Sequence, residues 1–356
     1  MNHYLRKLAK KSSAVHRQIR HFYQKQDRLC PMNPYGRDFF AIPHTLNVEH
    51  MFPNVIAIKV TNACLGECAF CFRQKEMREE LNEITVHEID LTFNEYLPSY
   101  NSLQFSDETR IKEILITGGE PFLLRHELLN ELLKKARRAG VQTIRIGSRA
   151  LSVSPWLVDN ELLQVLQQHL PLTVVIHINH VDELTPEAIQ ACLALQQIGI
   201  SLKNQAVLLR GVNDSIEDLQ KLTTKLQQIA IKPYRLNHCM PVGYQQLRTT
   251  VRKGIELIRD LRECNDSDDN FVFCVITPFG KTTDPGEEHI LDQKLGIDLL
   301  SVRDHATSLF NDPQTYQDAC FLKLRLTSPT TKDADLPKEV WYMDGCSDGA
   351  TVSRAS

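Results

Sequence analysis

Six short runs rich in β-branched residues alternate with segments of helical periodicity, and this alternation narrows the fold more than any other feature. Pro186 and Ser215 are suited to open helical segments, and Gly140 and Gly199 are suited to end them. Strands that alternate with helices are typical of a parallel α/β sheet, and six such units predict a partial TIM-type (β/α)6 barrel. The expected strands are Val55–Val60, Glu113–Thr117, Thr143–Ile146, Thr173–Ile178, Gln205–Leu209 and Tyr234–Asn237.

Polar motifs follow the ends of the expected strands. Because the carboxyl ends of barrel strands meet at one face, we expect these motifs to form one shared site. The motifs are a cysteine-rich loop after the first strand, Gly118-Gly119-Glu120-Pro121 after the second, Gly147-Ser148-Arg149 after the third and His177-Ile178-Asn179-His180 at the end of the fourth.

The cysteine-rich loop contains Cys64, Cys68 and Cys71 in a C-x3-C-x2-C spacing. Three thiolates this close together can hold three corners of a cubane iron–sulfur cluster. The loop has no fourth cysteine, so the fourth iron would keep an open position for chemistry. A zinc site is the alternative, but structural zinc usually takes four protein ligands, often as two C-x2-C pairs, and no second pair is present.

The cysteine spacing together with the glycine turn resembles the radical S-adenosylmethionine (radical SAM) superfamily. The resemblance implies a [4Fe-4S] cluster whose free iron is chelated by SAM, and cleavage of SAM to a 5′-deoxyadenosyl radical by one electron. It implies that Gly118, Gly119 and Glu120 bind the amino group of SAM, where paired glycines permit a close backbone approach. An external electron donor such as flavodoxin or ferredoxin would supply the electron.

The region from about residue 50 to residue 285 further resembles lysine 2,3-aminomutase and its relatives. The motifs that carry this resemblance are Arg145-Ile-Gly147-Ser148-Arg149, His177-Ile-Asn179-His180, Asn204-Gln205-Ala-Val-Leu-Leu209-Arg210-Gly211-Val-Asn213-Asp214 and Arg248-Thr-Thr-Val-Arg-Lys-Gly254-Ile-Glu256. The block from Gln205 to Asp214 is the most specific of them, since a ten-residue match rarely arises by chance.

This second resemblance implies an enzyme that moves an α-amino group to the β-carbon of an amino acid with the help of pyridoxal 5′-phosphate (PLP). An amine is the right nucleophile for the PLP aldehyde, and a guanidinium fork suits a carboxylate. The implied roles are SAM contacts for His177 and Gln205, further cofactor contacts for Ser148 and Arg149, a grip on the substrate α-carboxylate by Arg73, and a Schiff base to PLP on Lys281.

The sequence departs from the family pattern at the PLP phosphate and at the substrate side chain. Met51 stands where the family has a basic residue for the phosphate, and His50 or Arg149 is the expected substitute. Met240 and Cys274 stand where lysine-using members place two aspartates. Because an ammonium buried against a thioether and a thiol would be unpaired, free lysine is expected to be a poor substrate.

Length and charge fit a cytoplasmic enzyme. The chain has 356 residues and a net charge of −3, which does not favour nucleic acid as a partner, and no apolar run is long enough to cross a membrane.

We expect a basic, helical N-terminal extension over residues 1–49, the barrel over 50–285 and an irregular C-terminal segment over 286–356. The C-terminal zinc cluster of the clostridial lysine enzyme is absent. Small amino acids are the expected partners, and self-association is expected from the family.

Two rival functions stay open on the sequence alone. The first is a radical SAM enzyme without PLP that acts on another small molecule or on a peptide, which Met51 favours and Lys281 opposes. The second is an iron–sulfur binding module that never cleaves SAM. The Gly118–Pro121 turn, His177 and Gln205 disfavour this module, because a scaffold has no need of a SAM pocket.

Overall fold

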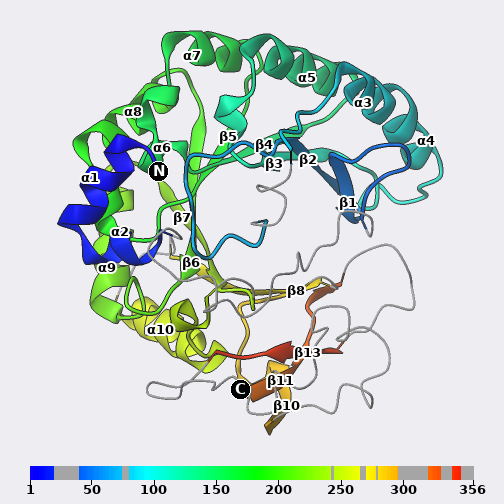
Figure 1. Ribbon diagram of the computed structural model, residues 1–356. Helices are drawn as coiled ribbons and strands as arrows, with labels where there is room; N and C mark the ends of the chain where they lie inside the picture. Colours follow the sequence, from blue (N-terminus) through cyan, green and yellow to red (C-terminus); the bar gives the residue numbers. More distant parts are fainter. Residues whose placement is uncertain are drawn as a thin grey trace.

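Seven consecutive strands run parallel in one sheet of the computed structural model (Figure 1). All six expected strands are present as β2 to β7, although β6 begins four residues earlier than predicted, and β8 is an additional parallel strand. The strands are β2 (Val55–Thr61), β3 (Glu113–Gly118), β4 (Thr143–Ser148), β5 (Thr173–Ile176), β6 (Ser201–Leu208), β7 (Lys232–His238) and β8 (Val272–Thr277). The structure describes residues 1–19, 40–73, 80–241, 244–264, 270–277, 280–295, 320–329 and 339–345.

The sheet does not close on itself, which confirms the expected partial barrel. Antiparallel strands extend both edges of the parallel part, so that the two ends of the sheet are different strands. These strands are β1 (Val48–Phe52) beside β2, β9 (Gly280–Thr283) beside β8, and β12 (Ser328–Pro329) beside β9.

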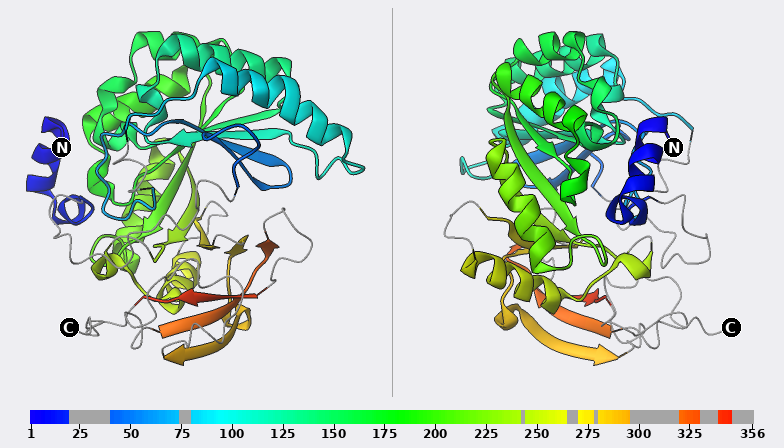
Figure 2. Two further views of the ribbon diagram at one scale, coloured as in Figure 1. Left: turned by 45° about the vertical axis from the view of Figure 1, so that its right-hand side comes forward. Right: turned by 90° about the vertical axis from the view of Figure 1, so that its left-hand side faces the viewer.

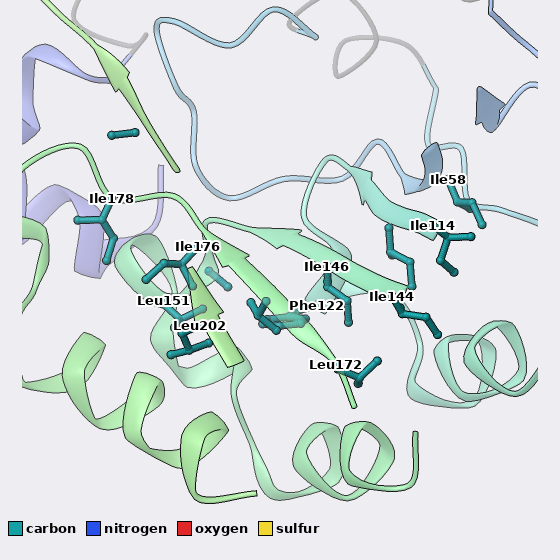
Figure 3. Close-up of a cluster of buried hydrophobic side chains, with 14 of the residues drawn as sticks. Ile58, Ile114, Phe122, Ile144, Ile146, Leu151, Leu172, Ile176, Ile178 and Leu202 are labelled. Carbon is teal, nitrogen blue, oxygen red and sulfur yellow. The ribbon is translucent and has the colours of Figure 1, made fainter. Parts of the chain in front are cut away.

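Each strand buries one face against the helices and turns the other toward the inside of the curve. On β3 and β4 the fully buried residues are Ile114, Ile116, Ile144 and Ile146, which alternate with half-buried ones as a strand with a two-residue period requires. Figure 3 shows Ile114, Ile144 and Ile146 packed with Phe122, Leu172 and Leu202. The other face, here called the concave face, carries Glu113, Leu115 and Thr117 on β3 and Arg145 and Gly147 on β4.

Helices form a layer outside the sheet, and their ends follow the predicted signals (Figure 1). Pro186 is the first residue of its helix, Ser215 caps the next, and Gly140 and Gly199 have positive φ just after helix ends. The helices are α3 (Val86–Asp90), α4 (Leu97–Ser102), α5 (His126–Arg138), α6 (Ala150–Val153), α7 (Asn160–Gln167), α8 (Pro186–Gln197), α9 (Ile216–Gln228) and α10 (Val251–Glu263), with a π-helical stretch (Leu91–Tyr96) between α3 and α4. No helix in these described ranges combines the length and hydropathy that a bilayer crossing requires.

The described start of the chain is helical and packs on the barrel. Helices α1 (His3–Lys11) and α2 (Ser13–Arg17) bury Leu5, Ala9 and Val15, and Ile19 just after α2 is buried with them. Polar contacts fix their position, since the Tyr4 hydroxyl lies 2.6 Å from Thr185 Oγ1 and Ser12 donates to Asp182 at 2.6 Å.

The C-terminal part differs from the expected irregular segment. Strands β10 (Ile290–Leu295), β11 (Cys320–Arg325) and β13 (Glu339–Met343) form a separate antiparallel sheet, drawn in gold to red in Figure 2. Fully buried Arg248 ties this sheet to the barrel by donating to the carbonyl oxygens of Met343 and Asp344. Long stretches separate these strands in the sequence, so no local turn signal marks their pairing.

Candidate active site

Two of the three cysteines in the loop after β2, Cys64 and Cys68, lie beside Gly66. The Gly66 amide donates to Cys64 Sγ at 3.4 Å, and a Cβ at Gly66 would lie 3.1 Å from Cys68 Sγ and 3.6 Å from Cys64 Sγ. Burial raises the pKa of Cys64, and negative charge on Cys68, Glu120 and Cys71 raises it further. Cys64 is therefore within electrostatic reach of both Cys68 and Cys71. A bound metal would reverse the effect on the pKa, because coordinated thiols lose their protons.

The paired glycines after β3 lie against the backbone at the start of this loop. A Cβ on Gly118 would sit 2.4 Å from the Thr61 carbonyl oxygen, and one on Gly119 would sit 2.0 Å from the Ala63 carbonyl oxygen. Two main-chain hydrogen bonds join the same segments, from Gly119 N to Thr61 O at 2.6 Å and from Glu120 N to Ala63 O at 2.8 Å. The close approach that glycine permits is thus made to the cysteine loop. The predicted contact with SAM stays a prediction.

Glu120 is buried, with an exposed fraction of 1%, and joins the ends of β3 and β4. Its carboxylate accepts hydrogen bonds from Ser148 Oγ at 2.7 Å, Arg149 N at 2.9 Å and Phe122 N at 3.1 Å. Burial raises the pKa of Glu120. The structure therefore gives Glu120 and Ser148 a role in holding the two turns together, while their predicted contacts with SAM are not tested.

Arg149 places a positive charge beside the cysteine loop. Its Nη1 donates to Cys68 Sγ at 2.6 Å, and its Nη2 donates to Gln18 Oε1 at 2.6 Å and to Glu183 Oε2 at 3.0 Å. Burial opposes this charge, but Cys68 and Glu183 outweigh it and raise the pKa of Arg149.

The other expected substitute for Met51, His50, also has hydrogen-bond partners within the protein. His50 is buried, with its Nδ1 2.7 Å from the Tyr96 hydroxyl and its Nε2 3.1 Å from the Pro53 carbonyl oxygen. His50 and Arg149 are thus both hydrogen-bonded within the protein, and a phosphate contact of either residue stays a prediction. The side chain of Met51 lies outside the described residues.

Gln18 belongs to this site although it lies in the N-terminal extension. Its fully buried side chain donates to Glu183 Oε1 at 3.0 Å and accepts from Asn179 Nδ2 at 2.9 Å as well as from Arg149. Its carbonyl oxygen accepts from Ala69 N at 2.8 Å, inside the cysteine loop. Sequence reasoning missed Gln18 and Glu183, and no local pattern marks either of them. Asn179 and His180, which follow the end of β5, have hydrogen-bond partners within the protein.

His177 has an unpartnered nitrogen next to the loop. Its ring centroid lies 5.4 Å from that of Phe70, which stands between the second and third cysteines. Burial, and then the charge of Arg149, lowers the pKa of His177 to about 3, so the ring is neutral. Its Nε2 is buried with no hydrogen-bond partner in the described structure. A buried polar atom of this kind is normally satisfied, so the site fits a ligand at this position.

Arg73 meets a carboxylate of the protein itself. Its Nη2 lies 3.2 Å from Glu49 Oε2, and Lys59 Nζ lies 2.7 Å from Glu49 Oε1, with all three side chains buried. Although burial acts in the opposite direction, Arg73 and Lys59 hold the pKa of Glu49 below its usual range. The predicted grip of Arg73 on a substrate carboxylate is untested, and a substrate there would share the guanidinium with Glu49.

Lys281 and Cys274 lie together on the concave face, one on β9 and one on β8. Cys274 is fully buried and its Sγ lies 3.6 Å from Thr283 Oγ1, while Lys281 Nζ lies 5.2 Å from the centroid of the Phe52 ring. Burial, followed by the charge of Arg235, lowers the pKa of Lys281, which favours the neutral amine. Met240 follows the end of β7 and is half-buried. Gln205 is half-buried on the same face of β6.

Comparison with known proteins agrees with this geometry. The model of the radical SAM superfamily matches residues 58–223, from β2 into α9. An L-lysine 2,3-aminomutase of Acetoanaerobium sticklandii is 30% identical over 276 residues, which are 77% of this chain and 64% of that protein. An L-lysine 2,3-aminomutase of Methanococcus maripaludis is 33% identical over 218 residues, which are 61% of this chain and 48% of that protein.

A glutamate 2,3-aminomutase of Clostridioides difficile is 29% identical over 217 residues, which are 60% of this chain and 49% of that protein. The chain thus spans less than two thirds of the length of each of these relatives. The cysteine loop and the glycine turn lie inside the matched region, whereas Lys281 lies beyond the part that the superfamily model covers. Residues 58–223 are therefore similar to the radical SAM superfamily, and 77% of the chain is similar to an L-lysine 2,3-aminomutase.

Proposed function

We propose that this protein is a PLP-dependent radical SAM isomerase that moves an α-amino group to the β-carbon of an amino acid other than lysine. The observation that carries the proposal is the meeting of two sets of residues on one sheet. The cysteine loop and the orphaned His177 Nε2 lie at the carboxyl ends of β2 and β5, and Lys281 lies on the concave face at β9. On this proposal, two chemically different cofactors would bind to residues of the same sheet.

Each residue has a role that its surroundings support. Cys64, Cys68 and Cys71 would hold three irons, and Arg149 would balance the negative charge of the sulfurs. His177 Nε2 is placed to hydrogen-bond a ligand beside the loop. When bound, the cluster with SAM supplies a radical that abstracts hydrogen, and PLP supplies an aldehyde that forms an imine and acts as an electron sink.

The Lys281 amine would hold PLP, because burial and Arg235 favour its unprotonated form and an unprotonated amine attacks an aldehyde. Cys274 lies on the neighbouring strand β8 and, together with Met240, stands where the lysine-using relatives are expected to show acids. The substrate side chain is therefore proposed to carry no ammonium group, because Met240 and Cys274 offer no compensating charge. A relative that is a glutamate 2,3-aminomutase supports substrate variation within the group.

Two measurements on the anaerobically reconstituted full chain test the proposal. With a strong reductant, the wild type and a Cys264→Ala control at the exposed end of α10 should release 5′-deoxyadenosine from SAM, whereas Cys68→Ala should release none. If the wild type binds iron but releases no 5′-deoxyadenosine, the proposal is wrong and the protein is an iron–sulfur binding module.

The PLP part of the proposal has its own test. Borohydride reduction in the presence of PLP should leave a pyridoxyl group on Lys281, identified by peptide mass spectrometry, and Lys281→Ala should lose it. An unmodified Lys281 together with active SAM cleavage would favour the radical SAM enzyme without PLP. A screen of the common amino acids for β-amino products, with flavodoxin or ferredoxin as the reductant, would then name the substrate.

A further inference from the structure

The concave face holds more positive than negative side chains. Glu49 is shared by Lys59 and Arg73, and Glu113 forms an ion pair with Arg145. Three further cations on this face form no ion pair among the described residues. They are Lys203 on β6, Arg235 on β7 and Lys281 on β9.

An irregularity in the sheet brings Tyr234 and Arg235 to the same side of β7. Asn204 pairs with Pro233 and the next residue, Gln205, pairs with Arg235, so that β7 has one extra residue at this point. Such a bulge places two successive side chains on one face, and bulges are frequent beside active sites because they redirect side chains. The Arg235 guanidinium lies 4.8 Å from the centroid of the Tyr234 ring, and Lys203 Nζ lies 5.4 Å from it.

Lys281 is the third cation of this group. Arg235 on β7 pairs in register with Val272 on β8, and Lys281 on β9 pairs with Ile276 on β8. Val272 and Ile276 are four residues apart on one strand, so their side chains are on the same face. Arg235 and Lys281 therefore lie on the same face of the sheet, on either side of β8. The charge of Arg235 acts on Lys281 more strongly than that of any other residue. Bringing like charges together in a partly desolvated site is unfavourable unless an anion joins them.

A second observation at the same place also calls for a ligand. Asn237 is 7% exposed, and its Oδ1 is buried with no hydrogen-bond partner in the described structure. Its register places it between Arg235 and Cys274 on the concave face. An orphaned acceptor beside unpaired cations fits a ligand that carries both a negative group and a hydrogen-bond donor.

We propose that Arg235 and Lys203, seated on Tyr234, form an oxyanion-binding subsite for the ligand that Lys281 holds. The subsite deepens the proposed function and rests on it for the identity of that ligand. Two sources share the required chemistry, namely the phosphate of the pyridoxal cofactor and the side-chain carboxylate of an acidic amino acid. If the ligand is the cofactor phosphate, Arg235 supplies the cation that Met51 does not supply at the expected position. If it is a substrate carboxylate, Arg235 supplies the charge that selects the substrate.

Calorimetric titration of the reconstituted full chain tests the subsite. Inorganic phosphate and glutarate are the two probes, used separately on wild type, on Arg235→Gln and on Lys221→Gln, which removes an exposed lysine from α9 on the outer layer. At least one probe should bind to wild type, and Arg235→Gln should weaken it tenfold or more, since a charge-assisted contact is lost. Lys221→Gln should bind as wild type does.

The two probes separate the sources. Loss of phosphate binding alone assigns the subsite to the cofactor, and loss of glutarate binding alone assigns it to the substrate. Arg235→Lys, which keeps the charge, should recover part of the affinity and so excludes a folding defect as the cause. Equal binding by wild type and Arg235→Gln, or binding of neither probe to wild type, would overturn the subsite. Because neither titration uses an imine or SAM cleavage, failure of the proposed function would show separately, in the borohydride experiment.

Discussion

Replacing Gly119 by alanine should separate the cysteine loop from the turn that supports it. The new Cβ would lie 2.0 Å from the Ala63 carbonyl oxygen, 2.7 Å from its carbon and 2.9 Å from the Asn62 carbon. All three are backbone atoms, so no side chain can move aside, and one segment must shift by roughly 1.5 Å to reach an ordinary contact. The φ of Gly119 is not in the left-handed region, so the penalty is steric alone.

The size of the effect follows from the contacts that the shift breaks. The hydrogen bonds from Gly119 N to Thr61 O and from Glu120 N to Ala63 O would be lost, each contributing about 1 kcal/mol. Overpacking adds about 1–3 kcal/mol, which makes the total roughly 3–5 kcal/mol. Because Ala63 adjoins Cys64, the same shift should displace the first cluster ligand.

Gly147→Ala is the matched control. Its Cβ would meet nothing closer than the Ile116 carbonyl oxygen at 3.8 Å, an ordinary contact on the neighbouring strand. The assay is urea unfolding followed by circular dichroism, together with iron content after anaerobic reconstitution. Gly119→Ala should show a lower urea midpoint and less iron than Gly147→Ala. Indistinguishable midpoints and iron contents would refute the close approach of the two backbones.

Three other outcomes follow from the buried contacts. Gln18→Leu leaves the Asn179 amide without an acceptor and should lower stability by about 1–3 kcal/mol and reduce iron retention, whereas Gln190→Leu on the exposed side of α8 should do neither. Arg149→Gln removes a cation from Cys68 and should shift the cluster potential downward by roughly tens of millivolts, measured by EPR-monitored titration; an unchanged potential would contradict the contact. Glu49→Gln should cost about 3 kcal/mol or more at pH 7, since it leaves Lys59 and Arg73 without their carboxylate. Because the folded pKa of Glu49 is lowered, its contribution is present above the usual carboxyl pKa and is lost as the pH falls through the folded value. Stability of the variant should therefore fall less steeply than that of wild type below about pH 4.5 in acid unfolding curves, and parallel curves would contradict the lowered pKa.

Local signals were sufficient for the barrel strands and for most helix ends. The β-branched runs predicted β2 to β7, and Pro186, Ser215, Gly140 and Gly199 predicted helix limits, because these preferences act within a few residues. The start of β6 was missed because Ser201–Asn204 contains little that distinguishes a strand from a loop. The C-terminal sheet was missed because β10, β11 and β13 pair across long intervals.

Contacts between distant residues were beyond reach of the sequence. Gln18 and Glu183 are separated by 165 positions and meet in one buried network with Arg149. Glu49 and its partner Arg73 belong to different elements, and their ion pair changes the expected role of Arg73. Nothing in the spacing of these residues distinguishes a buried partner from a solvated one.

By itself the sequence determined the chemistry that is concentrated in short segments: three thiols in one loop, a glycine turn after a strand, and an alternation of strands and helices that makes a parallel sheet. Those features depend on spacing along the chain and on the conformational preferences of single residues. Only the tertiary structure decided which charges are neutralised and which are left over. The pairing of Glu49 and Glu113 with cations, and the isolation of Arg235, Lys203 and Lys281, arise from strand register and burial, because both the electrostatic and the desolvation energy depend on distances in space.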